Sequence, residues 1–145
     1  MNVEFKIANE TNVEEIIKVC NICFDETTDV NQAKQIFETQ QNDKNQIYLI
    51  GIVDNKIVAH TKITIIPTIF DSMDTYAVLN HVCVLKEYRN QKIATKMLET
   101  VEKICKERGC TSMKLWSKNF RQAAHACYKK FGFEVIDAAF FEKEL

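Results

Sequence analysis

The sequence predicts an α/β (α+β) fold in which a mixed central sheet of about six to seven strands carries helices on both faces. Three long strand-like segments follow one another between residues 46 and 84, and two helix-like segments precede them. Consecutive strands joined by short turns pair antiparallel, whereas the later strand–helix–strand unit requires a parallel crossover. The 145 residues include three glycines, one proline and no low-complexity linker, so we expect a single domain over residues 1–145.

The N-terminal third predicts one strand and two helices. Residues 3–8 alternate apolar and polar side chains, as a strand does. Thr11 and Glu14 have the spacing of a capping box, and apolar residues then repeat at helical spacing as far as Phe24. A second, short helix is expected from residue 31 to about residue 40, with its apolar side chains turned inward.

The central segment predicts three long strands. Residues 46–53 are almost continuously apolar, which is typical of a strand buried on both faces. A turn at residues 54–56 leads into a second strand, residues 56–66, so this pair is a predicted hairpin. A loop, residues 68–74, leads to the third strand, residues 75–84.

The last third predicts a helix, a strand, a second helix and a final strand or hairpin. Ile93 begins an apolar stripe at helical spacing, and Gly109 marks the expected end of that helix. Residues 112–117 form the expected strand and residues 121–131 the second helix. Residues 133–145 are then expected to form a last strand or hairpin.

Composition excludes several classes of protein. The formal net charge of −1 is not that of a nucleic-acid binder. No apolar run approaches the ~18 residues of a membrane span, and the N-terminus has no apolar signal-peptide segment. We therefore expect a cytoplasmic protein that binds neither nucleic acid nor membranes.

Six cysteines are spread along the chain. Cys20 and Cys23 form a C-x-x-C pair on the apolar face of the first predicted helix, but neither a second such pair nor a histidine pair gives the spacing of a zinc site. We expect reduced cysteines that serve as small apolar side chains, and no metal.

Four polar residues, Arg89, Asn90, Gln91 and Lys92, join the third long strand to the helix that begins at Ile93. A helix N-terminus exposes unpaired N–H groups and carries partial positive charge, so it attracts anions. The Arg89 and Lys92 side chains add charge that can meet a phosphate. The junction therefore suits a phosphate-like group, although basic residues also occupy solvated turns.

The segment VCVLKEYRNQKIATKML, residues 82–98, resembles the acetyl-CoA-binding segment of the GCN5-related N-acetyltransferase (GNAT) family. In that family a V-x-V strand is followed by Arg/Gln-x-x-Gly-x-Gly/Ala, which opens a long helix. Residues 119–133 resemble the family's later helix, with an asparagine, an alanine, a tyrosine and a Gly-Phe pair in matching places. The resemblance covers nearly the whole chain and implies the GNAT fold and acetyl-CoA-dependent transfer of an acetyl group to an amine.

The resemblance also implies which residues hold acetyl-CoA. The turn and the first helical N–H groups would cradle the pyrophosphate, and the pantetheine arm would lie along the preceding strand like an added strand. Lys118 and Arg121 are looser candidates for the distal part of the molecule. The implied cofactor-binding residues are Val82, Cys83, Val84, Arg89, Asn90, Gln91, Lys92, Ile93, Ala94, Thr95, Asn119 and Tyr128.

Two positions depart from the family's pattern, because Asn90 and Lys92 stand where glycines are usual. Asparagine tolerates left-handed dihedral angles. A lysine with positive φ would be strained, so we expect ordinary helical dihedral angles at Lys92, with its charge near the pyrophosphate.

Acetyl transfer needs a neutral amine, stabilisation of an oxyanion and a proton for the departing thiolate. The resemblance implies direct attack of the amine on acetyl-CoA, with the backbone N–H of Val84 as the favoured oxyanion donor. Tyr128 matches the tyrosine that protonates the thiolate, although it also fits an aromatic residue packed on a helix face. Cys83 lies on the same strand and is expected to pack rather than to react, because no histidine–carboxylate pair can be read around it.

The identity of the general base stays open. Family members often carry an acid a few residues before V-x-V, where this sequence has Asn80 and His81. Both are candidate catalytic residues, but Asn80 cannot usefully take up a proton, whereas the reference pKa of histidine, ~6.5, suits a base near neutrality. A polar residue that only lines the cleft is one alternative to a base here. Ordered water is the alternative to His81.

The acceptor is expected to bind between the first two helices, the loop of residues 68–74 and Asn80. Phe70, Asp71 and Asp74 of that loop offer contacts to an aromatic or cationic amine of a small molecule. Three alternatives stay open: a non-catalytic acyl-CoA-binding regulatory module, an enzyme that acetylates a protein amine, and a structural domain with an incidental basic turn. The family also gives an expectation of a homodimer.

Overall fold

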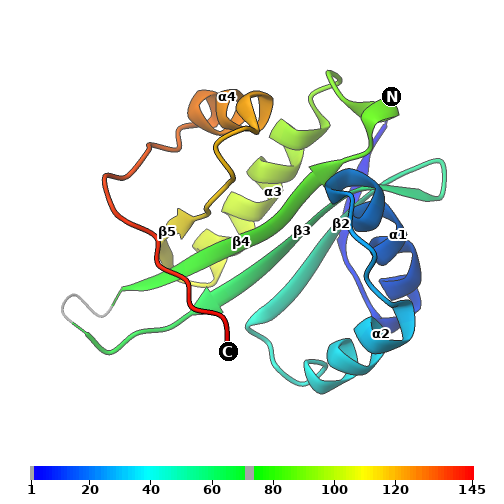
Figure 1. Ribbon diagram of the computed structural model, residues 1–145, viewed down its shortest axis with the longest axis horizontal. Coiled ribbons are helices and arrows are strands. Elements are labelled where there is room, and N and C mark those ends of the chain that lie inside the picture. Colours follow the sequence, from blue (N-terminus) through cyan, green and yellow to red (C-terminus); the bar gives the residue numbers. More distant parts are fainter. Residues whose placement is uncertain (1, 71–73) are drawn as a thin grey trace.

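The computed structural model describes residues 2–70 and 74–145 and contains one mixed sheet with the strand order β1-β2-β3-β4-β5 (Figure 1). The predicted fold class, a mixed sheet with helices on both faces, is confirmed, and five strands take the place of the expected six to seven. The strands are β1 (Glu4–Ile7), β2 (Gln46–Val53), β3 (Lys56–Ile66), β4 (Thr75–Val84) and β5 (Cys110–Lys114).

The first four strands pair antiparallel, and β4 pairs with β5 in parallel, as predicted. The β2–β3 connection is a two-residue turn in which Asp54 and Asn55 have φ values of 48° and 62°. Turns of this kind match the twist of the flanking strands, and Asp and Asn tolerate positive φ better than most residues. Local turn chemistry therefore produces the predicted hairpin.

Helices cover both faces of the sheet (Figure 1). Two of them, α1 and α2, lie on one face, while α3 lies on the other with α4 beside it. The helices are α1 (Val13–Phe24), α2 (Val30–Thr39), α3 (Ile93–Glu107) and α4 (Gln122–Phe131), and short 3-10 helices span Glu10–Asn12 and Lys86–Tyr88. None of the helices in the described residues is long and apolar enough to cross a membrane.

The capping box that precedes α1 uses the side chains of Asn9 and Asn12 and not those of the predicted pair, Thr11 and Glu14. Asn9 Oδ1 accepts a hydrogen bond from the Thr11 N–H at 2.9 Å, and Asn12 Oδ1 accepts one from the Asn9 N–H at 3.0 Å. The box caps the 3-10 turn rather than α1 itself. The prediction was wrong because the chain inserts this extra turn before the helix.

The core is formed where β2, β3 and β4 meet the apolar faces of α1 and α3. Met97, Leu98 and Val101 of α3 have no exposed surface, and neither have Ile63 and Ala59 of β3. Complete burial of a large aliphatic side chain stabilises a fold by ~1.5–3 kcal/mol. This packing gives the functional region a rigid support.

Strand β4 changes its surroundings half-way along its length. From Thr75 to Val78 it pairs with β5 on one side and β3 on the other. In the described residues the ladder with β5 stops at Val78, while pairing with β3 continues to Val84 around a bulge at which His81 has a φ of 51°. A bulge bends and twists its strand. The second half of β4 therefore presents an outer edge that no strand covers.

Residues 132–145 have no regular secondary structure, so the predicted final strand or hairpin is wrong. Gly132, with φ of 120°, ends α4. Phe133 then packs against Tyr128, and Phe140 against Trp116, with ring centroids 5.8 and 5.3 Å apart. Val135 and Phe141 are largely exposed. Strand formation depends on a neighbouring strand and on burial, and these apolar residues have neither in the described structure.

Candidate active site

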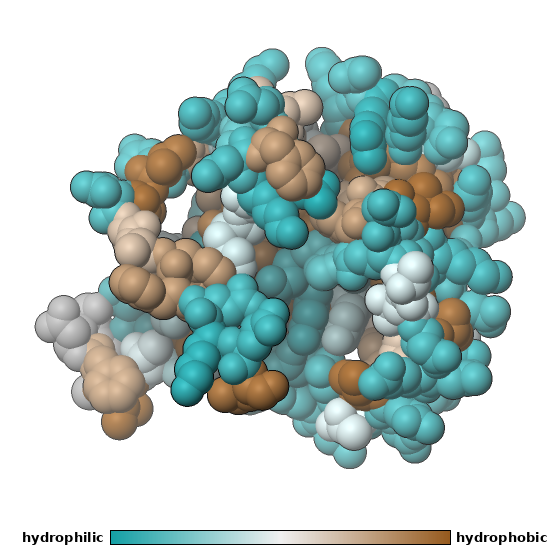
Figure 2. Space-filling view, viewed as in Figure 1, coloured by the Kyte–Doolittle hydropathy of each residue, from teal (hydrophilic) through white to brown (hydrophobic). Residues whose placement is uncertain are grey.

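A cavity of about 1070 Å³ opens between the end of α1, the second half of β4, the start of α3 and α4. In the space-filling view the molecule is hollowed over the strands between α1 and the C-terminal segment (Figure 2). The cleft lies where β4 and β5 part, so the backbone edge of Leu79–Val84 forms one of its walls. Such an edge offers backbone N–H and C=O groups to an extended ligand.

Most of the predicted site residues meet in this cleft. Two predicted contacts, Gln91 and Asn119, are not among the residues that line it. The residues brought together are Asn80, His81, Val82, Cys83, Val84, Arg89, Asn90, Lys92, Ile93, Ala94, Thr95 and Tyr128. Two segments of the sequence, residues 80–95 and the helix α4, therefore build a single site.

The turn between β4 and α3 has the left-handed geometry that glycine usually provides. Asn90 has a φ of 61°, and Lys92 has φ 64° and ψ 14°. The prediction of ordinary helical angles at Lys92 was wrong. The chain must reverse between Tyr88, which ends the preceding 3-10 helix, and Ile93, which begins α3. This reversal fixes the backbone whatever residue stands there, at a conformational cost of ~1–2 kcal/mol for a residue with a Cβ.

Lys92 is the N-cap of α3, and its side chain makes no capping hydrogen bond. The N–H groups of Ile93, Ala94 and Thr95 lie in the first turn, where a helix provides no acceptors. All three residues line the cleft. The N-terminus of α3 therefore presents unpaired donors and partial positive charge to the cleft.

Arg89 ties the turn to the strand. Its Nε–H donates to the Val84 carbonyl at 2.9 Å, and its guanidinium lies beside the Cys23 thiol at the end of α1. Its charge therefore stays at the strand end of the turn. Basic side chains dominate the cleft, because Glu26 is the one carboxylate in its described lining, against Arg89, Lys92, Lys118, Arg121 and Lys130.

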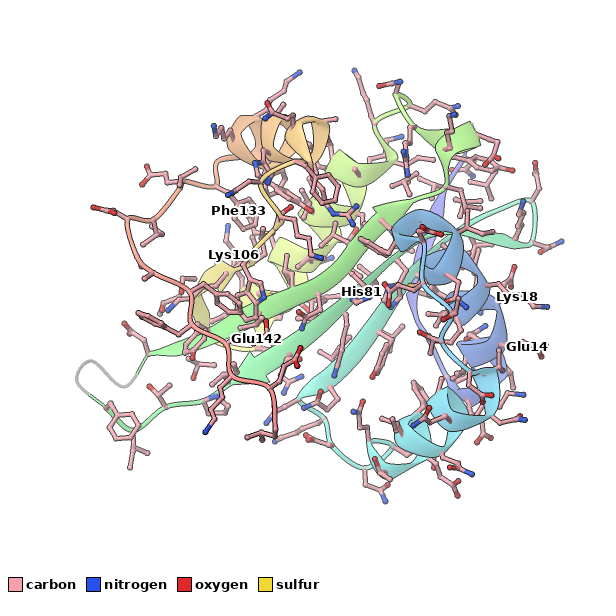
Figure 3. The ribbon with its side chains drawn as sticks, in the orientation of Figure 1. Glu14, Lys18, His81, Lys106, Phe133 and Glu142 are labelled. Atoms are coloured by element: carbon pink, nitrogen blue, oxygen red, sulfur yellow. The ribbon has the colours of Figure 1, made fainter. Side chains whose placement is uncertain are left out.

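His81 and Glu26 form a hydrogen-bonded pair that the sequence did not reveal. His81 Nε2 lies 2.7 Å from Glu26 Oε1, and both side chains are partly exposed to the cleft. His81 projects from the bulge of β4 towards α1 (Figure 3), where its ring meets the ring of Phe24 at a centroid distance of 4.7 Å. Glu26 follows α1 and is 55 residues away in sequence, so only the fold brings the two together. Asn80, beside His81, also faces the cleft.

Tyr128 reaches the cleft from α4. Burial raises the pKa of its hydroxyl to about 12, with a further contribution from the neighbouring Cys127. A phenol with so high a pKa stays protonated through the neutral range and can act only as a proton donor there. This is the state required of a general acid.

The loop that was expected to receive the acceptor lies apart from the cleft in the described residues. Phe70 is largely exposed, and neither Phe70 nor Asp74 lines the cavity. Asp71 lies outside the described residues. The end of α1, with Cys23, Phe24 and Glu26, takes the place of this loop in the cleft wall.

Comparisons with known proteins identify the family of this chain and its fold. Residues 12–133 match the family model described as the acetyltransferase (GNAT) family. The chain is 29% identical over 150 residues to the uncharacterized protein YyaT of Bacillus subtilis (strain 168). The alignment covers 98% of this chain and 88% of that protein.

The fold is shared with many solved structures, and two of them serve as examples. A transcriptional regulator from Bacillus halodurans C-125 superimposes with a TM-score of 0.90 at 19% identity. The superposition covers 99% of this chain and 100% of the regulator's chain. A predicted acetyltransferase from Clostridium acetobutylicum, solved with acetyl-CoA, superimposes with a TM-score of 0.78 at 18% identity over 98% of this chain and 96% of its own.

Proposed function

The chain belongs to the acetyltransferase (GNAT) family, and we propose that it transfers the acetyl group of acetyl-CoA to a primary amine of a small molecule by direct attack in a ternary complex. One observation carries the proposal. A single cavity holds the uncovered edge of β4, the positively charged turn, the His81–Glu26 pair and Tyr128. Each supplies one part of what acetyl transfer requires.

The turn fits the pyrophosphate of coenzyme A by the chemistry of its donors. Unpaired N–H groups of Ile93, Ala94 and Thr95 meet an anion best at a helix N-terminus, and the Lys92 charge adds to them. The uncovered edge of Val82–Val84 suits the amide groups of the pantetheine arm, which would pair with it as an added strand does. Bound acetyl-CoA supplies the activated acetyl group.

His81 is the proposed base. With its Nε2–H donated to Glu26 at 2.7 Å, the lone pair resides on Nδ1, which can accept the proton that the attacking amine loses. Glu26 fixes this tautomer and stabilises the imidazolium that forms. A water molecule held by the pair is the alternative acceptor of the proton.

The remaining steps belong to β4 and α4. The Val84 N–H is the proposed donor to the thioester carbonyl oxygen as negative charge develops on it. The Tyr128 hydroxyl is the proposed proton donor to the departing thiolate, and its raised pKa, about 12, keeps that proton available.

The acceptor is a cationic amine in this proposal. A free primary amine is protonated in neutral solution, so it enters as an ammonium ion. It gives up one proton to water before the neutral amine attacks, and the second proton, lost on attack, is the one that His81 takes up. Glu26 is the carboxylate of the described lining that can attract it, and the Phe24 ring beside His81 offers an apolar contact. The cavity volume, about 1070 Å³, is sufficient for a small molecule beside the end of the cofactor arm.

The test follows release of free coenzyme A thiol from acetyl-CoA over a panel of small primary amines, with an unstructured lysine-containing peptide as comparison. We expect turnover with at least one small cationic amine and none with matched alcohols. Turnover with the peptide alone would replace the small-molecule acceptor by a protein amine. Saturable acetyl-CoA binding without turnover on any amine would contradict the enzymatic proposal.

A second candidate function is a non-catalytic acyl-CoA-binding regulatory module. Two observations favour it: Asn80 and His81 stand where the family often has an acid, and the solved structure with a TM-score of 0.90 is described as a transcriptional regulator. This function predicts saturable acetyl-CoA binding without turnover on any amine of the panel.

A further inference from the structure

Three thiols and an imidazole gather behind the wall of the cleft. Cys20 and Cys23 come from α1, Cys83 from β4 and His60 from β3. Donor atoms of Cys20, His60 and Cys83 all lie within 4.8 Å of one another, and the Cys83 thiol also hydrogen-bonds to Cys23. The C-x-x-C spacing, which gave no sign of function in the sequence, thus places two thiols against a third in the fold.

The cluster is open to the cleft on one side. Cys23 is half-buried and Cys83 is buried, and both line the cavity. Cys20 and His60 lie deeper, with 7% and 3% of their surfaces exposed. A small reagent that enters the cleft therefore meets Cys23 first.

The surroundings make Cys23 a nucleophile. A hydrogen bond from Cys83, together with the positive charge of Arg89, lowers the pKa of the Cys23 thiol to about 7. The hydrogen bond from Cys83 also lowers the pKa of the Cys20 thiol, to about 5, but Cys20 is buried behind the cavity wall, so access to the cleft rather than the pKa distinguishes Cys23. Cys83 is held in the protonated form, because its hydrogen bonds to Cys20 and Cys23 raise its pKa. The pair thus joins an accessible thiolate to a neighbouring thiol that can resolve an oxidised form of it.

A second pair of contacting thiols in the same chain provides a contrast. Cys105 and Cys110 lie at the other end of α3, away from the cleft. Burial raises the pKa of Cys105 to about 12, and burial also raises the pKa of Cys110. Each pair therefore joins a buried thiol to a partly exposed one, but only the first pair lines the cleft and contains a thiol with a lowered pKa.

The hydrogen bonding of His60 favours thiol chemistry over a metal ion at the cluster. His60 Nδ1 lies 3.1 Å from the His81 carbonyl, to which it must donate a proton, and 3.5 Å from Cys20 Sγ. Metal ligation through Nδ1 would displace that proton. The proton would move to Nε2, which is buried without a hydrogen-bond partner in the described structure. Ligating histidines normally donate their second N–H to an acceptor.

We propose that Cys23 and Cys83 form an oxidation site for small hydroperoxides. The Cys23 thiolate attacks the terminal oxygen of the hydroperoxide, the O–O bond breaks, and Cys23 becomes a sulfenic acid. The alkoxide or hydroxide that leaves takes a proton from solvent water and departs as an alcohol or water. The Cys83 sulfur then attacks the Cys23 sulfur. An S–S bond forms, and the hydroxyl group leaves with the Cys83 proton as water. The hydroperoxide is reduced and the two thiols are oxidised.

The disulfide would tie the end of α1 to the edge of β4. Cys83 lies between Val82 and Val84, whose backbone is the proposed track of the pantetheine arm. Oxidation should therefore weaken acetyl-CoA binding, and this consequence rests on the proposed function. Formation of the disulfide itself does not.

The experiment treats the reduced full chain with a small excess of hydrogen peroxide, and maps disulfides by mass spectrometry of peptides made under thiol-blocking conditions. We expect two of the six thiols to be lost first, in a Cys23–Cys83 link that dithiothreitol reverses. Cys23→Ser should abolish the link, whereas the matched control Cys110→Ser should leave its rate unchanged. Acetyl-CoA binding is measured before and after oxidation within each variant. The affinity should fall at least tenfold in the wild type and in Cys110→Ser, where the link forms, and should stay unchanged in Cys23→Ser, where it does not.

Three results would overturn the oxidation site, and a fourth would overturn only its effect on acetyl-CoA binding. If Cys105 and Cys110 were oxidised as fast as Cys23 and Cys83, the surroundings of the Cys23–Cys83 pair would not make it more reactive. A Cys20–Cys83 link that persists in Cys23→Ser would assign the reactive thiolate elsewhere. Stoichiometric zinc in the purified chain, lost in Cys20→Ser, would make the cluster a metal site. A mapped link with unchanged acetyl-CoA binding would leave the oxidation site standing and contradict the proposed track of the pantetheine arm.

Discussion

The two halves of β4 are both rich in apolar, strand-forming residues, but only the second half lines the cleft. Thr75–Val78 lies between β3 and β5 and is covered on both edges, whereas Leu79–Val84 has β3 on one edge and the cleft on the other. The bulge at His81 follows the point where the two halves part. The end of the β4–β5 pairing therefore creates the cleft, because it exposes backbone groups of β4 next to the N-terminus of α3.

The largest effect is expected from His81, at the bulge itself. His81→Gln should lower kcat/KM by a factor of about 10² or more, the usual contribution of a general base, with little change in the free energy of unfolding because the side chain is exposed. Glu26→Gln should act in the same direction and less strongly, because it removes the orienting charge and leaves the imidazole. Steady-state kinetics measures both.

His125→Gln is the matched control, because His125 lies on α4 outside the described lining of the cleft. Equal losses for His81→Gln and His125→Gln would contradict the assignment. An unaltered rate in His81→Gln would make water the base.

Substitution of a tyrosine should also have different effects at the cleft and in the covered half of β4. Tyr128→Phe should lower kcat by a factor of roughly 10 to 10², since the departing thiolate loses its proton donor. Tyr76→Phe, in the covered half of β4, should leave kcat unchanged. Because the Tyr128 pKa is raised to about 12, the acid should stay protonated as pH rises through 10. A loss of kcat near pH 10 that disappears in Tyr128→Phe would contradict this protonation state.

Apolar truncations should separate stability from binding. Val78→Ala in the covered half removes buried methyl groups and should lower the free energy of unfolding by about 2 kcal/mol. Val82→Ala in the uncovered half is half-buried and should change stability by less than about 1 kcal/mol while it raises KM for acetyl-CoA. Urea unfolding and initial rates test the pair, and equal stability losses would remove the distinction between the two halves.

The smallest effect is expected at the turn. Lys92→Gly relieves a left-handed backbone with φ of 64° and should raise the free energy of unfolding by roughly 0.5–1 kcal/mol. Lys96→Gly, four residues on in the first turns of α3, should lower it by about 1 kcal/mol, because glycine is a poor helix former. Weaker acetyl-CoA binding in Lys92→Gly would mark the lysine charge as a ligand, whereas much tighter binding would mark it as an obstacle.

Sequence patterns were sufficient for the elements whose boundaries are set locally. The bounds of β2, β3 and β4 agree with the prediction because each apolar run ends at a turn or at Pro67. The expected final strand failed because a strand needs a partner, and residues 133–145 have none in the described structure.

The residues of the candidate site were predicted only where they lie in local motifs. Most of residues 80–95 and Tyr128 lie in motifs and line the cleft together, but Glu26 carries no local signal and is placed by packing of α1 against β4. Lys92 was assigned helical angles from its own preferences, while the reversal of the chain between two helices fixes its backbone. Residue preference therefore predicts elements well, and tertiary geometry decides the details of the site.

The central claim, that acetyl-CoA binds along the uncovered half of β4 and at the start of α3, is tested most directly by titration with acetyl-CoA followed through the backbone amide resonances. The account predicts saturable binding, with the largest shift changes at Val82–Val84 and Ile93–Thr95 and small ones at Thr75–Val78. No saturable binding, or changes as large at Thr75–Val78 as at Val82–Val84, would contradict it.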